Sequence, residues 1–383
     1  VDVTAARHAI QAKDYVAVSG GTWTLDAGTD GIHAENADDA EKGFIYVAGG
    51  SIDITAGSDG FDAANVLEVD GGDVTVSAGD DGLHAELDLV VNGGTVTVSL
   101  SYEGLEGSTV TITGGTIGVT SSDDGINAAG DPTKADSTET EPTDAVPTGE
   151  GDPSGGMPGK RDTNADVSVP NGSGDGQPGG GAPDASASPQ PGGGQAGGGT
   201  NDYDSTAQVT ISGGSVTVCA GGDGIDSNGD LTVTGGMTCV SGPTSDGDGS
   251  LDFPGTGTVS GGVVMCAGSS GMAQNFTDAS GQVSLLLGAS GQAGDAIALL
   301  DSNGNEVCAF VAQTSYACVL VCAPGIETGQ TYTLRYGENS LEVTPDAATY
   351  SSVTRQQGGL DAGGAPMNDA PAGGATGPSS RPS

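Results

Sequence analysis

The chain has 383 residues and carries 51 acidic against 9 basic side chains, a formal charge of −42. Phosphate binding needs lysine and arginine, so this charge excludes nucleic acid as a partner and favours cations, cationic surfaces or uncharged ligands. No apolar run approaches the roughly 18 residues that span a bilayer, so we expect no transmembrane segment.

Pairs of glycines mark a repeat along the chain. The second glycine of each pair stands at positions 21, 50, 72, 94, 115, 214, 236 and 262, at intervals of 29, 22, 22, 21, 99, 22 and 26 residues. Short units of this period without helical periodicity predict an all-β fold, a right-handed parallel β-helix solenoid of about 22 residues per coil. The first residues, "VDVTAARHAI", lie inside such a unit, so we expect a processed or trimmed N-terminus.

Each unit predicts two strands, one on either side of its glycine pair. After the pair, apolar and polar residues alternate, as in "GTWTLDA" and "GDVTVSA", and before it stands a short apolar run such as "FIYVAGG". The glycines serve the corner between the strands, where a positive φ or a close approach of coils is required. Trp23 aligns with the inward residues Ile52 and Val74, so we expect it in the core.

The long interval of 99 residues indicates an insertion within one coil, rich in Gly, Pro, Ser, Asp and Thr. Short strand-like runs follow the last repeat and would cap its open end. The predicted organisation is N-terminal coils over 1–129, a disordered insertion over 130–204, C-terminal coils over 205–275, a small β-strand cap over 281–344 and a disordered tail over 345–383.

Two polar columns run through the repeats. Nine residues after six of the eight marker glycines comes an acidic residue followed by glycine, giving Asp30, Asp59, Asp81, Glu103, Asp124 and Asp223. Three residues further on stand His33, Asp62, His84, Glu106, Asn127 and Asp226. The incomplete first unit places His8 and Gln11 in the same columns, and Asp80 and Asp123 add further acids.

These columns predict bound calcium. Equivalent residues of neighbouring coils lie about 4.8 Å apart, where ionised carboxylates repel by about 1 kcal/mol per pair even in water. Ca²⁺ between two carboxylates would relieve this repulsion at its usual oxygen distance of about 2.3–2.6 Å. The predicted ligands are Asp30, Asp59, Asp62, Asp80, Asp81, Glu103, Glu106, Asp123, Asp124, Asp223 and Asp226.

Two alternatives compete with calcium. Asp-Gly is a common turn pair, and solvated carboxylates tolerate one another, so the columns can be turn chemistry alone. His33 and His84 suggest zinc, but they stand two coils apart, about 10 Å, which is too far for one tetrahedral site.

Other candidate residues are less specific. Tyr15, Tyr46 and Tyr102 are candidates for stacking on a sugar. The six cysteines, at positions 219, 239, 266, 308, 318 and 322, have no metal-type spacing, and no disulfide pair can be assigned.

Several strings are similar to those of a known family. "RHAIQAKDYVAVSGG", "DGIHAENADDAEKGFIYVAGG", "DGIDSNGDLTVTGG", "SGPTSDGDGSLD" and "AGSSGMAQNF" resemble the bacterial carbohydrate-binding parallel β-helix family, a pectate-lyase-like group of cell-surface proteins. "TYTLRYG" is similar to that family's closing strands. The resemblance implies a right-handed parallel β-helix with bound calcium that binds polysaccharide, including acidic polysaccharide, without established lyase turnover.

We therefore expect a secreted, monomeric, non-catalytic protein of the bacterial cell surface that binds polysaccharide in a calcium-dependent way. A polysaccharide lyase is one alternative, although the repeats offer only Arg7, Lys13 and Lys42 as bases, none in a recognisable motif. The other alternative is a structural adhesin or spacer, in which the columns only build a stiff rod.

Overall fold

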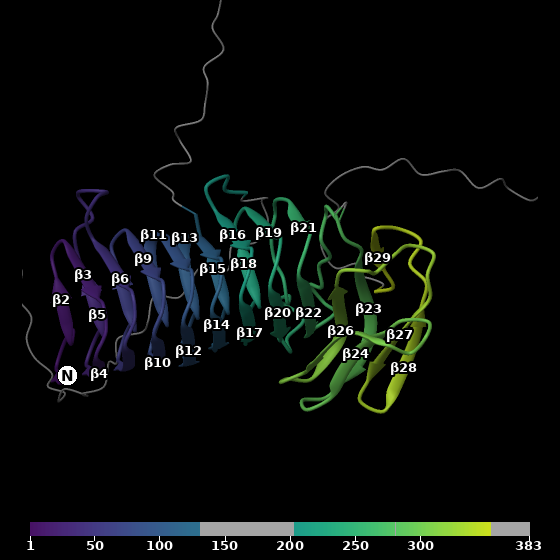
Figure 1. Cartoon of the computed structure of the whole chain (residues 1–383), viewed down its shortest axis with the longest axis horizontal. Coiled ribbons are helices and arrows are strands. Elements are labelled where there is room, and N and C mark those ends of the chain that lie inside the picture. The colour runs from purple at the N-terminus through teal and green to yellow at the C-terminus, as the bar shows by residue number, and fades with distance from the viewer. Residues whose placement is uncertain (131–202, 280, 354–383) are drawn as a thin grey trace, which may run out of the picture. The chain divides into compact units, whose positions relative to one another are not determined.

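The computed structural model describes residues 1–130, 203–279 and 281–353 (Figure 1). All of them belong to one unit, which comprises Val1–Asp136 and Asp202–Ser383. The described residues form strands and no helix, so the all-β prediction is confirmed. Accordingly, none of the described segments offers a helix long and apolar enough to cross a membrane.

The first row of strands lies in a 12-stranded sheet. Each repeat contributes the strand that follows its glycine pair, and the neighbouring repeat adds the next strand in parallel. The row consists of β1 (Asp2–Ala5), β4 (Thr22–Ala27), β7 (Ser51–Ala56), β10 (Asp73–Ser77), β12 (Thr95–Leu100), β14 (Thr116–Thr120), β17 (Ser215–Cys219), β20 (Met237–Ser241) and β22 (Val263–Gly268).

Two further parallel rows form a 13-stranded sheet and are joined by the long strands β11 (Leu83–Val91) and β13 (Leu105–Ile112). One row has short strands at the polar columns: β2 (Ile10–Ala12), β5 (Ile32–Ala34), β8 (Phe61–Ala63), β15 (Ile126–Ala128) and β18 (Ile225–Ser227). The other precedes the glycine pairs: β3 (Tyr15–Val18), β6 (Phe44–Val47), β9 (Val66–Val69), β16 (Gln208–Ile211), β19 (Asp230–Val233) and β21 (Gly257–Val259).

The register follows the repeat. Ile52, Val74 and Val96 lie side by side on β7, β10 and β12, and all three are buried. The polar residues between them, such as Thr75, face outward and are exposed. The two predicted strands per repeat are therefore confirmed, and the third, short strand at the columns is an addition that sequence reasoning missed.

The core contains the apolar residues of all three rows. Trp23, predicted to lie in the core, is partly buried against it, and its Nε1 donates to the carbonyl of Gly20 at 2.9 Å. At the corners, Gly72 and Gly94 have φ angles of 99° and 82°, the left-handed region that glycine adopts at little steric cost.

Antiparallel strands follow the last repeat. β26 (Tyr316–Cys322) pairs with β22 and with β23 (Ser284–Gly291). A separate four-stranded sheet contains β24 (Ala296–Leu300), β25 (Glu306–Val311), β27 (Tyr332–Tyr336) and β28 (Asn339–Val343). It shares a second apolar cluster with Met265 and Cys239, so the outward side of the last parallel strands is covered.

Two predicted segments lie mainly outside the described residues. Of the expected insertion, 130–204, only Gly130, Tyr203 and Asp204 are described. Of the expected tail, 345–383, residues 345–353 are described and include β29 (Thr349–Ser351), which pairs in parallel with β23. Ordered structure therefore extends beyond the predicted start of the tail at Pro345, because this short strand extends the sheet at β23.

Candidate metal and carbohydrate site

The second polar column is a continuous row of side chains. Parallel pairing sets each member beside its equivalent in the next repeat, in the order Gln11, His33, Asp62, His84, Glu106, Asn127 and Asp226. A bridge between Asp226 and Asp252 extends the row by one more carboxylate. The short strands β5, β8 and β18 and their equivalents therefore hold this column in register.

The first column lies at the bend that leads into these strands. The Oδ1 atom of Asp59 accepts a hydrogen bond from the backbone N–H of Asp81 at 2.9 Å, and Asp124 accepts one from Asp223 at 2.6 Å. Glu103 instead accepts a hydrogen bond from the Asn127 side-chain amide at 2.8 Å. The aspartates thus have a structural role at the bend, while their second oxygens remain free of this contact.

The two columns converge in four clusters. In each, one ligand atom from every member lies within 4.8 Å of those of the other members. The clusters are His8, Asp30 and His33; Asp59, Asp62 and His84; Asp81, Glu103 and Glu106; and Asp124, Asp223 and Asp226. We call them the first to fourth clusters. The third and fourth contain only carboxylates.

Burial and like charge make these carboxylates weak acids. Desolvation, a hydrogen bond with Glu106 and repulsion from Glu106 and Asp80 raise the pKa of Asp81 to about 8. Desolvation, followed by repulsion from neighbouring acids, raises the pKa of Asp226 to about 8 as well. The same causes raise the pKa of Asp59, Glu103, Asp124 and Asp223 to about 7, although hydrogen bonds from backbone or Asn127 oppose the rise. We call the two polar columns together the ladder. Deprotonating its carboxylates therefore costs free energy unless a cation compensates their charge.

Histidine side chains can compensate the carboxylate charge only in the N-terminal part of the described ladder. Burial lowers the pKa of His84, but its hydrogen bond to Asp62 and the charges of Glu106, Asp62 and Asp81 outweigh burial and raise it to about 9. In return, burial raises the pKa of Asp62, but the contacts with His84 and His33 outweigh it and lower that pKa. Beyond His84 the described ladder has no basic member.

One buried polar atom in the ladder lacks a partner. Asn127 donates its amide hydrogen to Glu103, but its carbonyl oxygen Oδ1 is buried without a hydrogen-bond partner. Asn127 lies between Glu106 and Asp226, hence between the third and fourth clusters. An orphaned carbonyl oxygen beside carboxylates matches the donor set that calcium prefers, and its burial is unfavourable without a ligand.

The structure brings together nine of the eleven predicted metal ligands, all except Asp80 and Asp123. Asp80 is exposed, and Asp123 accepts a hydrogen bond from the Tyr102 hydroxyl, which raises the pKa of that hydroxyl to about 12. Sequence reasoning missed the roles of His8 and Asp252. His8 stands in the incomplete first repeat, and the 26-residue interval after Gly236 displaces Asp252 from the regular spacing.

The three predicted sugar-stacking tyrosines lie in different settings. Tyr15 is 59% exposed and stacks on Phe44, with ring centroids 5.2 Å apart and planes inclined by 8°. Tyr46, on β6, donates its hydroxyl to Asp70 at 2.6 Å, and Tyr102 is an exposed side chain beside the ladder. Phe44, which sequence reasoning missed, packs against one face of the Tyr15 ring and holds it rigid.

A groove of about 660 Å³ runs beside the ladder. Its polar lining includes His33, Asp62, Glu35, Asn65, Glu86 and Ser108, contributed by successive repeats. A groove that crosses several repeats and offers carboxylate, amide and hydroxyl groups can hydrogen-bond an extended polyhydroxy chain.

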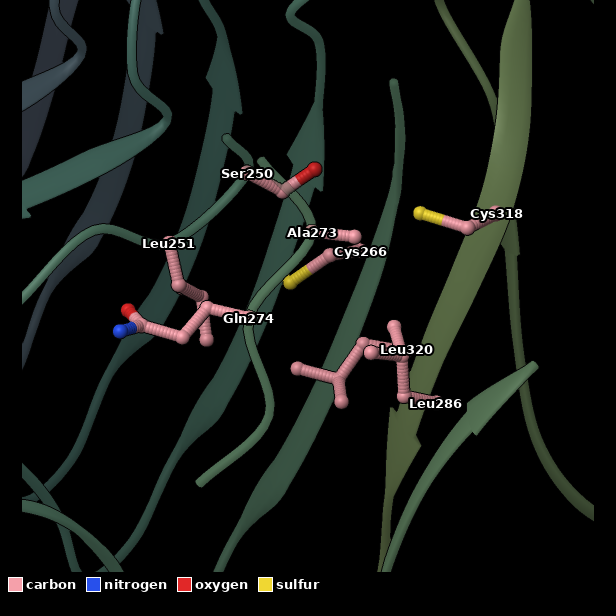
Figure 2. Close-up of a pocket in the computed structure, with 8 residues that line it drawn as sticks. All are labelled: Ser250, Leu251, Cys266, Ala273, Gln274, Leu286, Cys318 and Leu320. Carbon is pink, nitrogen blue, oxygen red and sulfur yellow. The ribbon is translucent and has the colours of Figure 1, made fainter. Parts of the chain in front are cut away.

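The cavity between the last repeat and β26 is a packing defect. It measures about 10 Å³, is almost wholly apolar, and lies between Cys266 on β22 and Cys318 on β26 (Figure 2). This is room for at most one water molecule. All six cysteines are free, and five are buried, with Cys318 donating to the Ser269 carbonyl at 3.0 Å.

Comparison with known proteins gives one match. A family model described as "Carbohydrate-binding domain-containing protein" matches residues 1–132, about a third of the chain. Neither the curated proteins nor the solved structures include a match. The matched residues contain the groove, the first three clusters and Asp124 of the fourth, so the comparison supports carbohydrate binding by the N-terminal repeats.

Proposed function

We propose that this chain is a non-catalytic polysaccharide-binding protein whose binding depends on calcium. In this proposal the three rows of strands are the faces of a right-handed parallel β-helix. The support is the parallel pairing of equivalent residues at one-repeat steps in every row. Such stacking aligns polar groups at a fixed repeat, as a polymeric ligand requires.

Calcium would be held by the third and fourth clusters. Both offer carboxylate oxygens only, and Asn127 adds an amide oxygen between them. Calcium takes 6–8 oxygen ligands with flexible geometry, so water or sugar hydroxyls would complete its coordination. Asp59 and Asp62 share their cluster with His84 and are weaker candidates, because that imidazole already neutralises Asp62.

Sugar would bind along the groove, next to the ladder. The carboxylates of Glu35 and Glu86 can accept hydrogen bonds from neutral sugars but would repel acidic ones. Calcium bound at Asp81 and Glu106 would reverse this preference and bridge sugar carboxylates. The unpartnered Asn127 oxygen lies between two clusters that offer only carboxylate oxygens. This observation carries the calcium part of the proposal.

We further propose that the protein acts outside the cell, at a bacterial surface. Extracellular calcium modules work with dissociation constants of about 10⁻⁴–10⁻³ M, which weak, partly solvated clusters can reach. The acidic, lysine-poor composition, rich in Thr, Ser and Gly, is typical of exported bacterial surface proteins and supports this location.

The test is a calcium titration of chelator-stripped protein by calorimetry, followed by retention on immobilised neutral and acidic polysaccharides with calcium or with chelator. The proposal expects stoichiometric calcium binding and glycan retention that chelator abolishes. Retention unaffected by chelator would overturn the calcium dependence. Calcium binding without retention of any glycan would favour the adhesin or spacer alternative, and an unsaturated product absorbing in the ultraviolet would favour the lyase.

A further inference from the structure

The first cluster differs from the others because it contains two imidazoles. His8 Nδ1 lies 2.7 Å from Asp30 Oδ2, and His33 Nδ1 lies 3.6 Å from the same oxygen. His33 Nδ1 also lies 2.6 Å from Asp62 Oδ2. Two ring nitrogens thus face one carboxylate oxygen at the beginning of the ladder, and His33 also contacts Asp62.

These groups are held in place and shielded from solvent. The Asp30 side chain is 8% exposed, and the rings of His8 and His33 stack with centroids 4.6 Å apart and planes 14° from parallel. The stacking presents both Nδ1 atoms to the same carboxylate. Thr29 Oγ1 lies 3.1 Å from the same His8 Nδ1, and the Arg7 guanidinium lies 3.4 Å from Nε2 on the other side of the ring.

The donor set selects the class of metal. Calcium prefers oxygen ligands, whereas imidazole nitrogen suits zinc and neighbouring transition ions. Zinc binds histidine nitrogen and carboxylate oxygen at about 2.0–2.2 Å, so tetrahedral ligand atoms lie roughly 3.4 Å apart. His33 Nδ1 and Asp30 Oδ2, 3.6 Å apart, are close to that spacing, and the three members of the cluster lie within 4.8 Å of one another. The 2.7 Å contact between His8 Nδ1 and Asp30 is a hydrogen bond, which would open when a metal ion replaces its proton.

We propose that His8, Asp30 and His33 form a three-ligand site for a divalent transition ion of the zinc class, with water completing its coordination. This site is separate in chemistry from the calcium clusters, so the ladder binds two classes of cation at its two ends. Among the described residues, the cluster of His84 holds no second imidazole, and His84 pairs with the carboxylates of Asp62 and Glu106, which makes it the internal control.

The competing explanation is that the histidines only form ion pairs with Asp30 and Asp62. Ion pairs account for each contact singly, but they do not require the two rings to stack with both Nδ1 atoms toward one carboxylate oxygen. A shared divalent ion bound by two neutral rings gives a reason for this arrangement. The two explanations differ in whether the protein binds metal stoichiometrically at these nitrogens.

The test uses the full chain, without a polyhistidine tag and with calcium in excess, titrated with Co²⁺ and followed by visible absorption. We expect one equivalent of Co²⁺ to give the intense bands of four-coordinate cobalt. Zinc should displace the bands, whereas further calcium should not. His8→Gln and His33→Gln should weaken cobalt binding by about 100-fold or more, while His84→Gln should change it by less than about 10-fold.

Two results would overturn the proposal: no four-coordinate bands in the parent protein, or equal losses in His84→Gln and His33→Gln. The calcium isotherm and circular dichroism of each variant report whether it still folds. Glycan retention is measured separately in calcium alone, so failure of the cobalt site and failure of the proposed function give different results.

Discussion

An aspartate of the first polar column can serve two purposes with its two oxygens. The Oδ1 atom of Asp30 accepts the backbone N–H of Asp59 at the bend, and its Oδ2 atom lies 2.7 Å from His8 Nδ1 in the first cluster. This explains why turn chemistry and metal binding are not exclusive at this column. Glu103 makes no such backbone contact and bonds Asn127 instead, so its carboxylate serves the ladder alone.

The first prediction concerns Asp226, whose buried carboxylate is among the most costly of the ladder to ionise in the folded protein. Burial and the acids Asp124 and Asp223 raise its pKa to about 8. Asp226→Asn should therefore stabilise the calcium-free protein at pH 8 by at least about 1 kcal/mol, because the buried charge is removed. The same change should weaken calcium binding by about 10-fold or more, since a ligand is lost. Chemical denaturation and calorimetry measure the two effects.

Asp53→Asn is the matched control, because Asp53 is an exposed outward residue of β7. It should alter neither stability beyond about 0.5 kcal/mol nor calcium affinity. If Asp226→Asn destabilised the calcium-free protein, the ladder could not be an array of uncompensated carboxylates.

At the scale of the strand and its turn, the glycine after each acidic residue is set by the approach of the next repeat. A Cβ at Gly82 would lie 2.5 Å from the Gly104 carbonyl oxygen and 2.6 Å from Val98 Cγ1. Gly82→Ala should therefore cost about 2–4 kcal/mol, because both neighbours must shift. Gly118→Ala, on β14, is the control, with no atom within 4 Å of its Cβ. Equal melting temperatures would contradict the close stacking.

The aromatic surface of β3 and β6 yields the third prediction. Tyr15 stacked on Phe44 offers a rigid face on which a sugar ring can lie. Tyr15→Ala should weaken glycan retention by about 5-fold or more without changing calcium affinity. Tyr203→Ala removes a comparably exposed tyrosine outside the family match and should leave retention unchanged. Affinity electrophoresis in a polysaccharide gel compares the variants, and equal mobility would exclude this face.

Sequence periodicity predicted the strands beside each glycine pair because alternation over four to six residues is a sufficient signal. It missed the third row, because a strand such as Ile32–Ala34 has only three residues and no alternation to detect. Most ladder residues could be predicted, since parallel stacking converts equal spacing into proximity. His8 and Asp252 could not be assigned roles, because they lie in an incomplete and a lengthened repeat, where spacing alone does not fix side-chain contacts.

At the scale of the whole molecule, the formal charge of −42 makes calcium-free folding pH-dependent. In the folded state six ladder carboxylates have pKa values raised to about 7 or 8: Asp59, Asp81, Glu103, Asp124, Asp223 and Asp226. In the unfolded chain the same groups titrate near 4. Between these values the folded protein binds more protons than the unfolded one, so the free energy of unfolding falls as pH rises.

The fourth prediction is that the melting temperature of chelator-treated protein falls steadily from pH 5 to pH 8, because stability gained from protonated carboxylates is lost through their folded-state pKa values. His84 acts in the same direction above about 6.5, since its pKa is raised to about 9. Saturating calcium replaces protons as the compensating charge, so the stabilisation by calcium should widen by at least about 5 °C over this range. Differential scanning calorimetry with calcium or chelator measures both curves.

General self-repulsion of so acidic a chain would give a similar trend, and ionic strength separates the two causes. At 1 M salt the Debye length falls to about 3 Å, which screens exposed charges but reaches buried neighbours much less. We therefore expect the pH dependence of the chelator-treated protein to persist at 1 M sodium chloride and to diminish in Asp226→Asn. If 1 M salt abolishes the pH dependence of the melting temperature, exposed surface charges cause it. The ladder would then not be the element that couples folding to calcium.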